Sequence, residues 1–417
     1  MKTASIALDT IGCKLNQAES EALTRELRNA GYRVVPAGQK ADVYILNTCT
    51  VTHIADRKAR HLLRMAHRRN PDALIIAIGC YVKRALQELI SIDGVGLAIE
   101  GKQNQNLVDL IKEAGYLPSN VHEQSYASRT RAMLKIQQGC SQNCLYCIVP
   151  QTRGKEISVP ASQVLTEVDQ LINDGFKEIV LTGTHIGAHD DLTDLVKRIL
   201  ENTRIERLRL SSLQPSDITP SLLELWQDKR LCRHIHLPLQ SGGDMILKQM
   251  GRRYTTSDFE NTVNRLRDAI PDIAVTTDII VGFPKESAAE FEESYDFCRR
   301  MKFANLHVFT YSPRPNTPAA TMKDLSPQIK KERSSRMLEL AAELSQKFNS
   351  RYIGQTMLVL WESKNGKYIE GLTDNYIRVF AESKKDLSNQ ILAAKLTSIR
   401  KNGLTGELLD SYQHPSR

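Results

Sequence analysis

The chain has 417 residues, of which 41% are hydrophobic and 25% charged, and its formal net charge is +8. This length exceeds what one hydrophobic core usually supports, so we expect two or three domains. The composition excludes a disordered or fibrous protein. The longest nearly apolar run, residues 73–82, is too short to span a bilayer, and the first residues lack the apolar segment of a signal peptide. We therefore expect a cytoplasmic protein without membrane association, whose positive charge suits a polyanionic partner.

Residues 1–120 alternate apolar strands with helical patterns. Asn16 is a candidate cap for a helix that follows the first strand, and Gly31 is a candidate stop for it. The repeated strand–helix pattern predicts a doubly wound parallel α/β domain. The strand candidates are residues 5–8, 42–46 and 74–78.

A cysteine follows each of these three strands, namely Cys13, Cys49 and Cys80. Loops that leave the carboxyl ends of parallel strands gather at one edge of a sheet, so these thiols are expected to converge. Three thiolates can hold an iron–sulfur cluster with one open iron. The alternative is three small buried thiols, because free cysteine is often buried.

A short loop then carries Cys140, Cys144 and Cys147, at spacings of four and three positions. Three thiolates are one ligand too few for a closed tetrahedral site or a fully ligated cubane, so one metal position would stay free. The spacing resembles the radical S-adenosylmethionine (SAM) signature, and Tyr146 before the third cysteine fits that pattern. A zinc knuckle with a distant fourth ligand and plain buried cysteines are the alternatives.

Residues 128–348 contain six strand candidates, each followed by helical sequence. This pattern predicts a partial, TIM-like (β/α)6 barrel, in which site residues lie at the carboxyl ends of the strands. The candidates are residues 132–137, 178–181, 207–210, 234–239, 274–280 and 306–309.

Residues 350–412 contain five short strand-like runs separated by polar turns, which predict a small antiparallel β-barrel. Such barrels can bind RNA through basic and aromatic side chains, and a structural end-cap is the alternative. The runs are residues 356–361, 368–372, 376–380, 391–399 and 405–409, and the RNA-binding candidates are Lys364, Lys367, Tyr368, Tyr376 and Arg378.

Taken together, the chain resembles the methylthiotransferases of the radical SAM superfamily. These have an N-terminal domain with an auxiliary cluster, a radical SAM domain and a C-terminal TRAM barrel. The stretch Gly12-Cys-Lys-Leu-Asn-Gln17 is most similar to the branch that modifies N6-threonylcarbamoyladenosine in tRNA, next to the anticodon. The other matching stretches are residues 47–51, 236–242, 277–284 and 311–319.

The resemblance implies conversion of that nucleoside to its 2-methylthio derivative by radical C–H activation, sulfur insertion and SAM-dependent S-methylation. It implies two [4Fe-4S] clusters, one on each cysteine triad, and SAM as cofactors. The implied partners are the tRNA anticodon stem-loop and an electron donor such as a flavodoxin-type reductant, without DNA or a membrane. The candidate SAM contacts are Tyr146, Gly183, Ser212, Gln240, Asp278 and Gly282.

Four arginines shortly after Cys49 are spaced three or four residues apart, which predicts a basic stripe along a helix that could contact phosphates. The alternative is a solvated helix face, the usual origin of such a run. They are Arg57, Arg60, Arg64 and Arg68. Cys232 and Cys298 lie outside both triads and are interpreted as structural. Other interpretations are action on isopentenyladenosine in tRNA or on a ribosomal-protein aspartate, and a non-catalytic iron–sulfur sensor that binds RNA.

Overall fold

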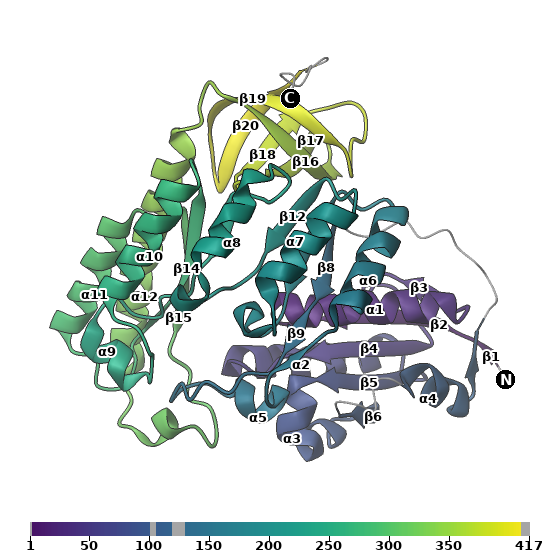
Figure 1. Ribbon diagram of the computed structural model, residues 1–417. Coiled ribbons are helices and arrows are strands. Elements are labelled where there is room, and N and C mark those ends of the chain that lie inside the picture. The colour runs from purple at the N-terminus through teal and green to yellow at the C-terminus, as the bar shows by residue number, and fades with distance from the viewer. Residues whose placement is uncertain (1, 101–105, 119–129, 410–417) are drawn as a thin grey trace.

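The structure is a computed structural model that describes residues 2–100, 106–118 and 130–409. The predicted domain limits at residues 120, 128 and 412 lie outside the described residues. Figure 1 shows an N-terminal parallel sheet, a central barrel of strands and helices, and a small C-terminal β-barrel at the top. Within the described ranges, no helix is both long and apolar enough to cross a membrane.

The N-terminal sheet has five parallel strands in the order β3-β2-β4-β5-β6. Its helices pack on both faces, α1 and α4 on one and α2 and α3 on the other, through separate apolar clusters. The predicted doubly wound sheet is therefore confirmed. The strands are β2 (Ser5–Thr10), β3 (Arg33–Val35), β4 (Val43–Thr48), β5 (Leu74–Gly79) and β6 (Val95–Ile99); the helices are α1 (Lys14–Asn29), α2 (His53–Arg69), α3 (Cys80–Ile90) and α4 (Leu107–Glu113).

The predicted cap of the first helix is wrong. Helix α1 begins at Lys14 with Cys13 at its N-cap position, so Asn16 lies inside the first turn. The Asn16 amide is used elsewhere, because its Nδ2 donates to the backbone oxygens of Ile11 and Thr48, both at 3.0 Å. Asn16 therefore joins the loops that follow β2 and β4.

The central domain forms an open barrel from two three-stranded parallel sheets, β12-β11-β8 and β13-β14-β15. Isolated bridges from Leu208 to Leu231 and from Ser212 to His236 join the two sheets. The strands are β8 (Arg131–Lys135), β11 (Glu178–Thr182), β12 (Arg207–Leu210), β13 (His234–His236), β14 (Ala274–Val281) and β15 (Asn305–Thr310). The predicted barrel strand at 234–239 is shorter, because Pro238 cannot donate to a strand ladder.

Helices cover the outside of this barrel and bury the apolar residues that face away from its centre. Several begin with a side-chain cap, and α10 and α11 have complete capping boxes. The helices are α6 (Ala161–Asn173), α7 (Leu192–Asn202), α8 (Pro220–Glu224), α9 (Asp244–Gln249), α10 (Thr256–Ala269), α11 (Ala288–Met301) and α12 (Pro327–Ser350). Helix α5 (Val149–Arg153) and the paired short strands β9 (Gln137–Gln138) and β10 (Ile157–Ser158) flank the cysteine loop. A further short parallel pair joins β1 (Lys2–Thr3) to β7 (Tyr116–Leu117).

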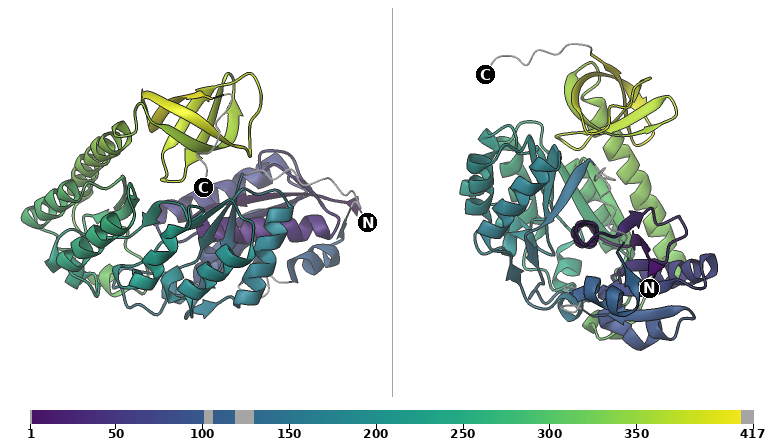
Figure 2. Two further views of the ribbon diagram at one scale, coloured as in Figure 1. Left: turned by 45° about the horizontal axis from the view of Figure 1, so that its top comes forward. Right: turned by 90° about the vertical axis from the view of Figure 1, so that its right-hand side faces the viewer.

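Helix α1 of the N-terminal domain lies inside the concave face of the central barrel. Its Ala18 packs with Met133 of β8 and Val180 of β11. The Met133 backbone N–H also donates to the Glu21 carboxylate at 3.0 Å. The right-hand view of Figure 2 looks along α1, which lies between the teal and green halves of the barrel. The N-terminal domain therefore fills part of the barrel interior.

The C-terminal barrel is closed, in the order β16-β17-β18-β20-β19, which confirms the predicted small barrel. One of its pairings, β18 with β20, is parallel, whereas an antiparallel barrel was predicted. Its Tyr376 stacks on His234 of β13, with 4.1 Å between ring centroids. It therefore covers the amino ends of the central strands. The strands are β16 (Thr356–Asn365), β17 (Tyr368–Thr373), β18 (Arg378–Glu382), β19 (Ile391–Arg400) and β20 (Gly403–Leu408).

Candidate functional site

The early cysteines lie at the carboxyl edge of the N-terminal sheet. Cys13 follows β2, Cys49 follows β4 and Cys80 begins α3 directly after β5. The connections leave β2 and β4 towards opposite sides of the sheet, so the first two cysteines flank the topological switch point, where open α/β sheets bind ligands. Burial raises the pKa of the Cys49 thiol to about 12, and the nearby Cys13 and Cys80 thiols raise it further. The structure therefore brings the three thiols together.

Gly12 makes this convergence possible. Its φ is +117°, and a Cβ atom at this position would lie 2.7 Å from Cβ of Cys49. A side chain would therefore push the first and second cysteine loops apart. The Cys13 thiol also donates to Oδ1 of Asn16 at 3.4 Å, and the Val51 N–H donates to the Cys49 sulfur at 3.5 Å. These contacts fix the loops around the three sulfurs.

The second cysteine loop is held at several points. Gly139 has φ of +83°, and a Cβ atom there would lie 1.8 Å from the Lys155 carbonyl oxygen. The Cys140 N–H donates to the Gly154 carbonyl at 2.9 Å. The Ser141 N–H and hydroxyl both donate to the Glu156 carboxylate. Desolvation raises the pKa of Glu156, but these hydrogen bonds together outweigh it and lower the pKa. These contacts fix the course of the loop around its three thiols.

Burial favours the neutral form of two thiols in each cysteine set, Cys49 and Cys80 in the first and Cys140 and Cys147 in the second. Burial raises the pKa of Cys147 to about 12 and also raises the pKa values of Cys80 and Cys140. A cationic metal is needed to stabilise the corresponding thiolates. In the described part of the chain, neither cysteine set has its three sulfurs within 4.8 Å of one another. A single tetrahedral zinc, with Zn–S of about 2.3 Å, would need sulfurs about 3.8 Å apart. The wider spacing fits a cluster, in which each thiolate binds a different iron.

A cavity of about 330 Å³ lies at the carboxyl ends of the central strands. Cys140, Cys144 and Cys147 form part of its wall, and so do Val51 and Thr52, which follow Cys49. The remaining wall comes from the loops after β11, β12, β13 and β15, together with β14. One cavity is therefore bounded by the radical-type cysteine loop and by the loop that carries an early cysteine.

Four of the six candidate SAM contacts line this cavity, namely Tyr146, Ser212, Gln240 and Asp278. Two of them belong to a hydrogen-bonded chain through His236, whose Nδ1 lies 2.7 Å from the Ser212 hydroxyl and whose Nε2 lies 3.0 Å from an Asp278 oxygen. This chain fixes the side chains across the junction of β12, β13 and β14. The backbone of Gln240 has a φ of +70°, a left-handed turn at which the polypeptide enters the cavity wall.

The other two candidates, Gly183 and Gly282, do not line the cavity. Gly183 packs against the backbone and side chain of Gln137, and Gly282 packs against the side chain of Lys330. These two glycines allow close packing of the residues behind the cavity wall.

Arg252 is a wall residue that the sequence interpretation missed. Its Nη1 donates to the Cys144 sulfur at 3.4 Å, and its guanidinium lies 4.8 Å from the Tyr254 ring centroid. The Tyr254 hydroxyl in turn lies 2.8 Å from the carbonyl oxygens of Pro238 and Leu239. No spacing pattern marks Arg252, because the loop after α9 meets the cysteine loop only in the folded protein. Thr184, His185 and Gln214 are further wall residues outside the predicted cofactor contacts.

Arg153 joins the segment after the second cysteine loop to the first cysteine set. It ends helix α5, and its Nε donates to the Cys80 sulfur at 3.0 Å. It also donates to Oδ1 of Asn16 at 2.7 Å and to both carboxylate oxygens of Glu19. A residue six positions after Cys147 is thus bonded to a ligand candidate of the other domain.

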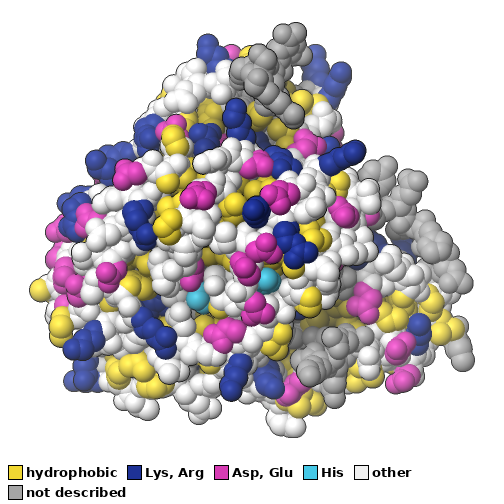
Figure 3. Space-filling model, viewed as in Figure 1, with side chains coloured by type: hydrophobic (Ala, Val, Ile, Leu, Met, Phe, Trp, Pro, Cys, Tyr) yellow, Lys and Arg dark blue, Asp and Glu magenta, His cyan; other side chains and the backbone are white. Residues whose placement is uncertain are grey.

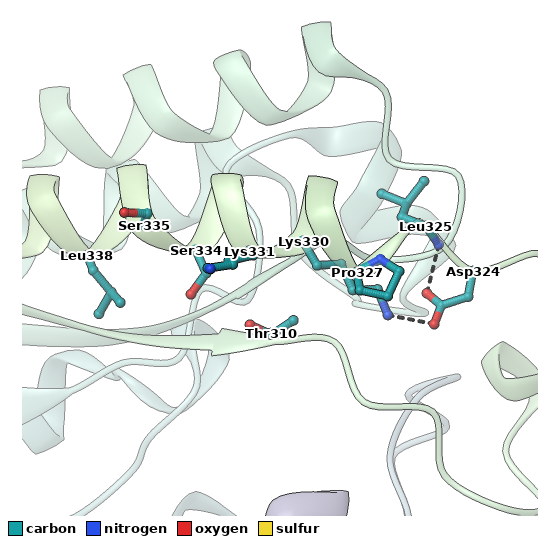
Figure 4. Close-up of a pocket in the computed structure, with 9 residues that line it drawn as sticks. All are labelled: Thr310, Asp324, Leu325, Pro327, Lys330, Lys331, Ser334, Ser335 and Leu338. Atoms are coloured by element: carbon teal, nitrogen blue, oxygen red, sulfur yellow. Dashed lines mark hydrogen bonds and ion pairs between the residues drawn. The ribbon is translucent and has the colours of Figure 1, made fainter.

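A second hollow, of about 650 Å³, lies between β15 and the start of α12 (Figure 4). Its Lys330 is paired with Asp324 at 2.6 Å and donates to the Tyr311 carbonyl at 3.3 Å. Thr310 is the residue that lines both this hollow and the central cavity. With no cysteine in its wall, this hollow lacks the metal-binding groups of the central cavity.

The basic stripe on α2 contains three of the four predicted arginines, and a histidine takes the place of the fourth. Arg57, Arg64 and Arg68 are exposed, and His61 completes their face of the helix. Arg60 is instead turned towards α3, where it pairs with Glu88 at 2.8 Å. We define Arg57, His61, Arg64 and Arg68 as the α2 basic face.

The C-terminal candidates lie on the barrel that covers the amino ends of the central strands, whereas the cavity opens at the carboxyl ends. Lys367 pairs with Glu382 at 2.7 Å and Arg378 pairs with Glu370 at 3.1 Å. Lys364 donates to a backbone carbonyl, and Tyr376 is packed against His234. On the face shown in Figure 3, basic and acidic side chains are interspersed over the barrel and the central domain.

Comparisons with known proteins agree with this geometry. Residues 134–298 match the radical SAM superfamily, and residues 5–99 match a family described as uncharacterized protein family UPF0004. Threonylcarbamoyladenosine tRNA methylthiotransferase MtaB of Bacillus subtilis is 37% identical to the chain, over 94% of each protein. The chain belongs to the radical SAM methylthiotransferase family.

This methylthiotransferase is also 33% identical to the tRNA-2-methylthio-N(6)-dimethylallyladenosine synthase of Syntrophotalea carbinolica, over 97% of the chain and 99% of that protein. Among solved structures, a radical SAM methyltransferase, TsrM from Kitasatospora setae, matches with a TM-score of 0.58 and 15% identity, over 76% of the chain and 77% of that structure. That likeness shows the fold alone. Cys232 and Cys298 of the methylthiotransferase are buried, and burial raises the pKa of both thiols, which fits structural residues.

Proposed function

We propose that this methylthiotransferase converts N6-threonylcarbamoyladenosine in tRNA, next to the anticodon, to its 2-methylthio derivative. One observation carries the proposal: the radical-type cysteine loop and the loop after Cys49 border the same cavity. A nucleobase in that cavity would meet both cysteine-bearing edges at once. The relatives named for threonylcarbamoyladenosine support this nucleoside as the substrate.

We assign one [4Fe-4S] cluster to Cys140, Cys144 and Cys147 and a second to Cys13, Cys49 and Cys80. The proposed division is an auxiliary-cluster domain over residues 1–120, a radical SAM domain over 128–348 and a TRAM domain over 350–412. When bound, the clusters and SAM supply the radical, the sulfur and the methyl group that replace a C–H bond with a C–S bond. An electron donor such as a flavodoxin-type reductant would be required, and a cytoplasmic location stays a prediction.

The protein's own residues position the reactants and limit water access. Tyr146 packs edge-on against Phe283, with 6.3 Å between ring centroids, and forms an apolar part of the wall. The Ser212–His236–Asp278 chain offers a carboxylate oxygen and a hydroxyl at fixed positions for the polar groups of SAM or nucleoside. Arg252 places a positive charge beside Cys144. Such preorganised groups lower the cost of aligning the reacting atoms.

We infer that the tRNA backbone lies along the α2 basic face, because α2 begins two residues after Val51 of the cavity wall. The His53 N–H at the start of this helix donates to the Ser312 hydroxyl, also part of the wall, at 3.1 Å. Phosphates on the basic face would therefore position a neighbouring base at the cavity entrance. Lys364, Lys367 and Arg378 stay as predicted contacts for a more distant part of the tRNA.

The test is anaerobic reconstitution of the protein with iron, sulfide, SAM and a reductant, with tRNA from a strain that lacks the modification. Mass spectrometry of the digested tRNA should detect 2-methylthio-N6-threonylcarbamoyladenosine. Formation of 2-methylthio-isopentenyladenosine instead would reassign the substrate, and 5′-deoxyadenosine without any thiomethylated nucleoside would exclude both tRNA nucleosides. Absence of 5′-deoxyadenosine would leave only the sensor interpretation. Cys298→Ala is the matched control for Cys147→Ala, because Cys298 is buried far from both cysteine loops in the apolar core of the central barrel.

A further inference from the structure

A lysine from the N-terminal domain enters the interior of the central barrel. Lys14 follows Cys13 and is the first residue of α1, one turn before Ala18, which packs on β8 and β11. Residues four apart share a face of a helix, so Lys14 is directed into the barrel with Ala18. Its Nζ lies 5.8 Å from the centroid of the Tyr376 ring, which the C-terminal barrel supplies.

Among the described residues, Lys14 has no ion-pair or hydrogen-bond partner. Within residues 2–100, 106–118 and 130–409, no carboxylate lies within 4.0 Å of its ammonium. The neighbouring cations, in contrast, have anionic partners. Arg209 is paired with Glu178 at 2.7 Å, and Arg131 is paired with Glu362. Lys14 is half-buried, and its ammonium lies over the Tyr376 ring but has no anionic partner among the described residues. Burying a charge without such a partner is costly, so a ligand with negative charge is expected there.

Two further groups, Asp278 and His307, lie near enough to Lys14 for an electrostatic interaction with it. Asp278 and His307 are directly opposite each other on the neighbouring strands β14 and β15, so their side chains share the inner face of the barrel. His307 is exposed although it lies on this inner face, which shows that the barrel is open at this level. Its ring nitrogens make no hydrogen bond to any described residue. Asp278 also lines the central cavity and therefore joins this inner space to it.

His236, Asp278 and His307 are close enough to hold a cation, since their ligand atoms lie within 4.8 Å of one another. Two features oppose that use. His236 is engaged on both ring nitrogens, by Ser212 and by Asp278. Lys14 adds positive charge near this group, as its influence on His307 shows: burial lowers the pKa of His307, and Lys14 lowers it further. The group is therefore better suited to hydrogen bonding with a polar organic ligand.

We infer that Lys14 binds the carboxylate of the threonyl group on the substrate nucleoside, with His307 and Asp278 as partners for its hydroxyl and N–H groups. This inference rests on the proposed function, because it concerns the nucleoside named there. A threonylcarbamoyl group carries one carboxylate, one hydroxyl and two urea N–H groups, which matches a cation, an imidazole and a carboxylate. Lys14 is thus a specificity-determining residue.

The same arrangement rejects an apolar substituent. A dimethylallyl group in this space would exclude water from Lys14 and His307 without giving either a partner. Sites built to hydrogen-bond a polar group discriminate strongly against analogues that lack it. A hydrogen bond to a charged group contributes about 1.5–3 kcal/mol, which corresponds to roughly a 10- to 100-fold change in affinity.

The test measures binding, so it does not depend on turnover. Reconstituted protein is titrated, with SAM present, with fluorescent anticodon stem-loops that carry threonylcarbamoyladenosine, isopentenyladenosine or unmodified adenosine. Wild type should prefer the first stem-loop. Lys14→Met should reduce this preference about 10- to 100-fold and leave affinity for unmodified adenosine unchanged, whereas Lys14→Arg should keep most of it. The matched control is Lys248→Met, which removes an exposed lysine of α9.

Because Lys14 adjoins Cys13, iron content is measured for every variant. If Lys14→Met loses iron, the decisive probe is wild type with a stem-loop whose threonyl carboxylate is converted to an amide, which should lose the preference to the same extent. A Lys14→Met protein with normal iron and an unchanged preference, or equal binding of acid and amide, would overturn the inference alone. If wild type shows no preference and forms no 2-methylthio product, the proposed function itself fails.

Discussion

Arg153 gives the most direct test of how the two halves of the site are joined. Its side chain is only 11% exposed, and its partner Glu19 is 22% exposed. Arg153→Met would leave Glu19, Asn16 and Cys80 without their shared donor. Breaking a buried pair by removing one partner costs about 3–5 kcal/mol. Arg153→Lys keeps the charge, but an ammonium cannot reach all three acceptors as the guanidinium does. We therefore expect this variant to lose about 1.5–3 kcal/mol of stability.

The assay is hydrogen exchange of the α1 backbone amides in metal-free protein, followed by mass spectrometry. Helix α1 carries both Asn16 and Glu19, so the lost contacts should appear as easier local opening of this helix. A loss of about 3–5 kcal/mol corresponds to exchange that is roughly 10²- to 4 × 10³-fold faster. Exchange in the sheet core of the N-terminal domain should change less.

Arg198→Met is the matched control. Arg198 is 42% exposed on α7 and its ion pair with Asp194 is 3.6 Å long, so its loss should change stability by less than about 0.5 kcal/mol. A threefold change in exchange rate corresponds to only about 0.6 kcal/mol, far less than the cost of breaking a buried ion pair. The reasoning would therefore be refuted if α1 exchange in Arg153→Met stayed within about threefold of wild type.

Three further predictions concern metal binding and RNA. Cys147→Ala and Cys13→Ala should each halve the iron bound after anaerobic reconstitution, and Cys298→Ala should leave it unchanged; equal iron in all three variants would contradict the assignment of two clusters. Gly139→Ala should impair loading of the cluster on Cys140, Cys144 and Cys147, because its Cβ would lie 1.8 Å from the Lys155 carbonyl. Gly154→Ala, which also has positive φ but nothing within 4 Å, should cost only about 1 kcal/mol and retain iron. Arg64→Ala should reduce the slope of log binding constant against log salt for tRNA by about 0.9, whereas the paired Arg60 should contribute less; an unchanged slope would exclude the α2 basic face.

In the N-terminal sheet, the three inner strands were predictable from sequence and the two edge strands were not, whereas all six strands of the central barrel were predicted. Residues 207–210 were predicted as a strand and form β12 with the same limits. Strands β3 and β6 were missed, because a three-residue edge strand such as Arg33–Val35 has too few positions for a pattern. The parallel pairing of β18 with β20 also has no local signal, since strand direction in a closed barrel is set by connections and not by side-chain alternation.

The site divides in a similar way. Cys140, Cys144 and Cys147 were identifiable because their spacing is local to one loop. The other three cysteines were identifiable because each follows a predicted strand of a parallel sheet, so their loops were expected to converge. Arg153 was not, because its partners Asn16 and Glu19 are more than 130 positions away in the chain. Gly183 was selected as a cofactor contact for its position after a strand, yet its neighbour Thr184 lines the cavity and Gly183 packs behind it. Sequence shows which loops meet but not which side of a loop faces the ligand.

The placement of α1 inside the barrel has a consequence for how the enzyme is assembled. The central barrel, produced without residues 1–120, would expose Met133 and Val180 to water and would lack its inner lining. The relative position of the two cysteine-bearing edges is therefore set by packing within the chain itself. Substrate binding therefore does not need to bring two separate domains together. The base must instead fit a cavity whose width the fold has already set.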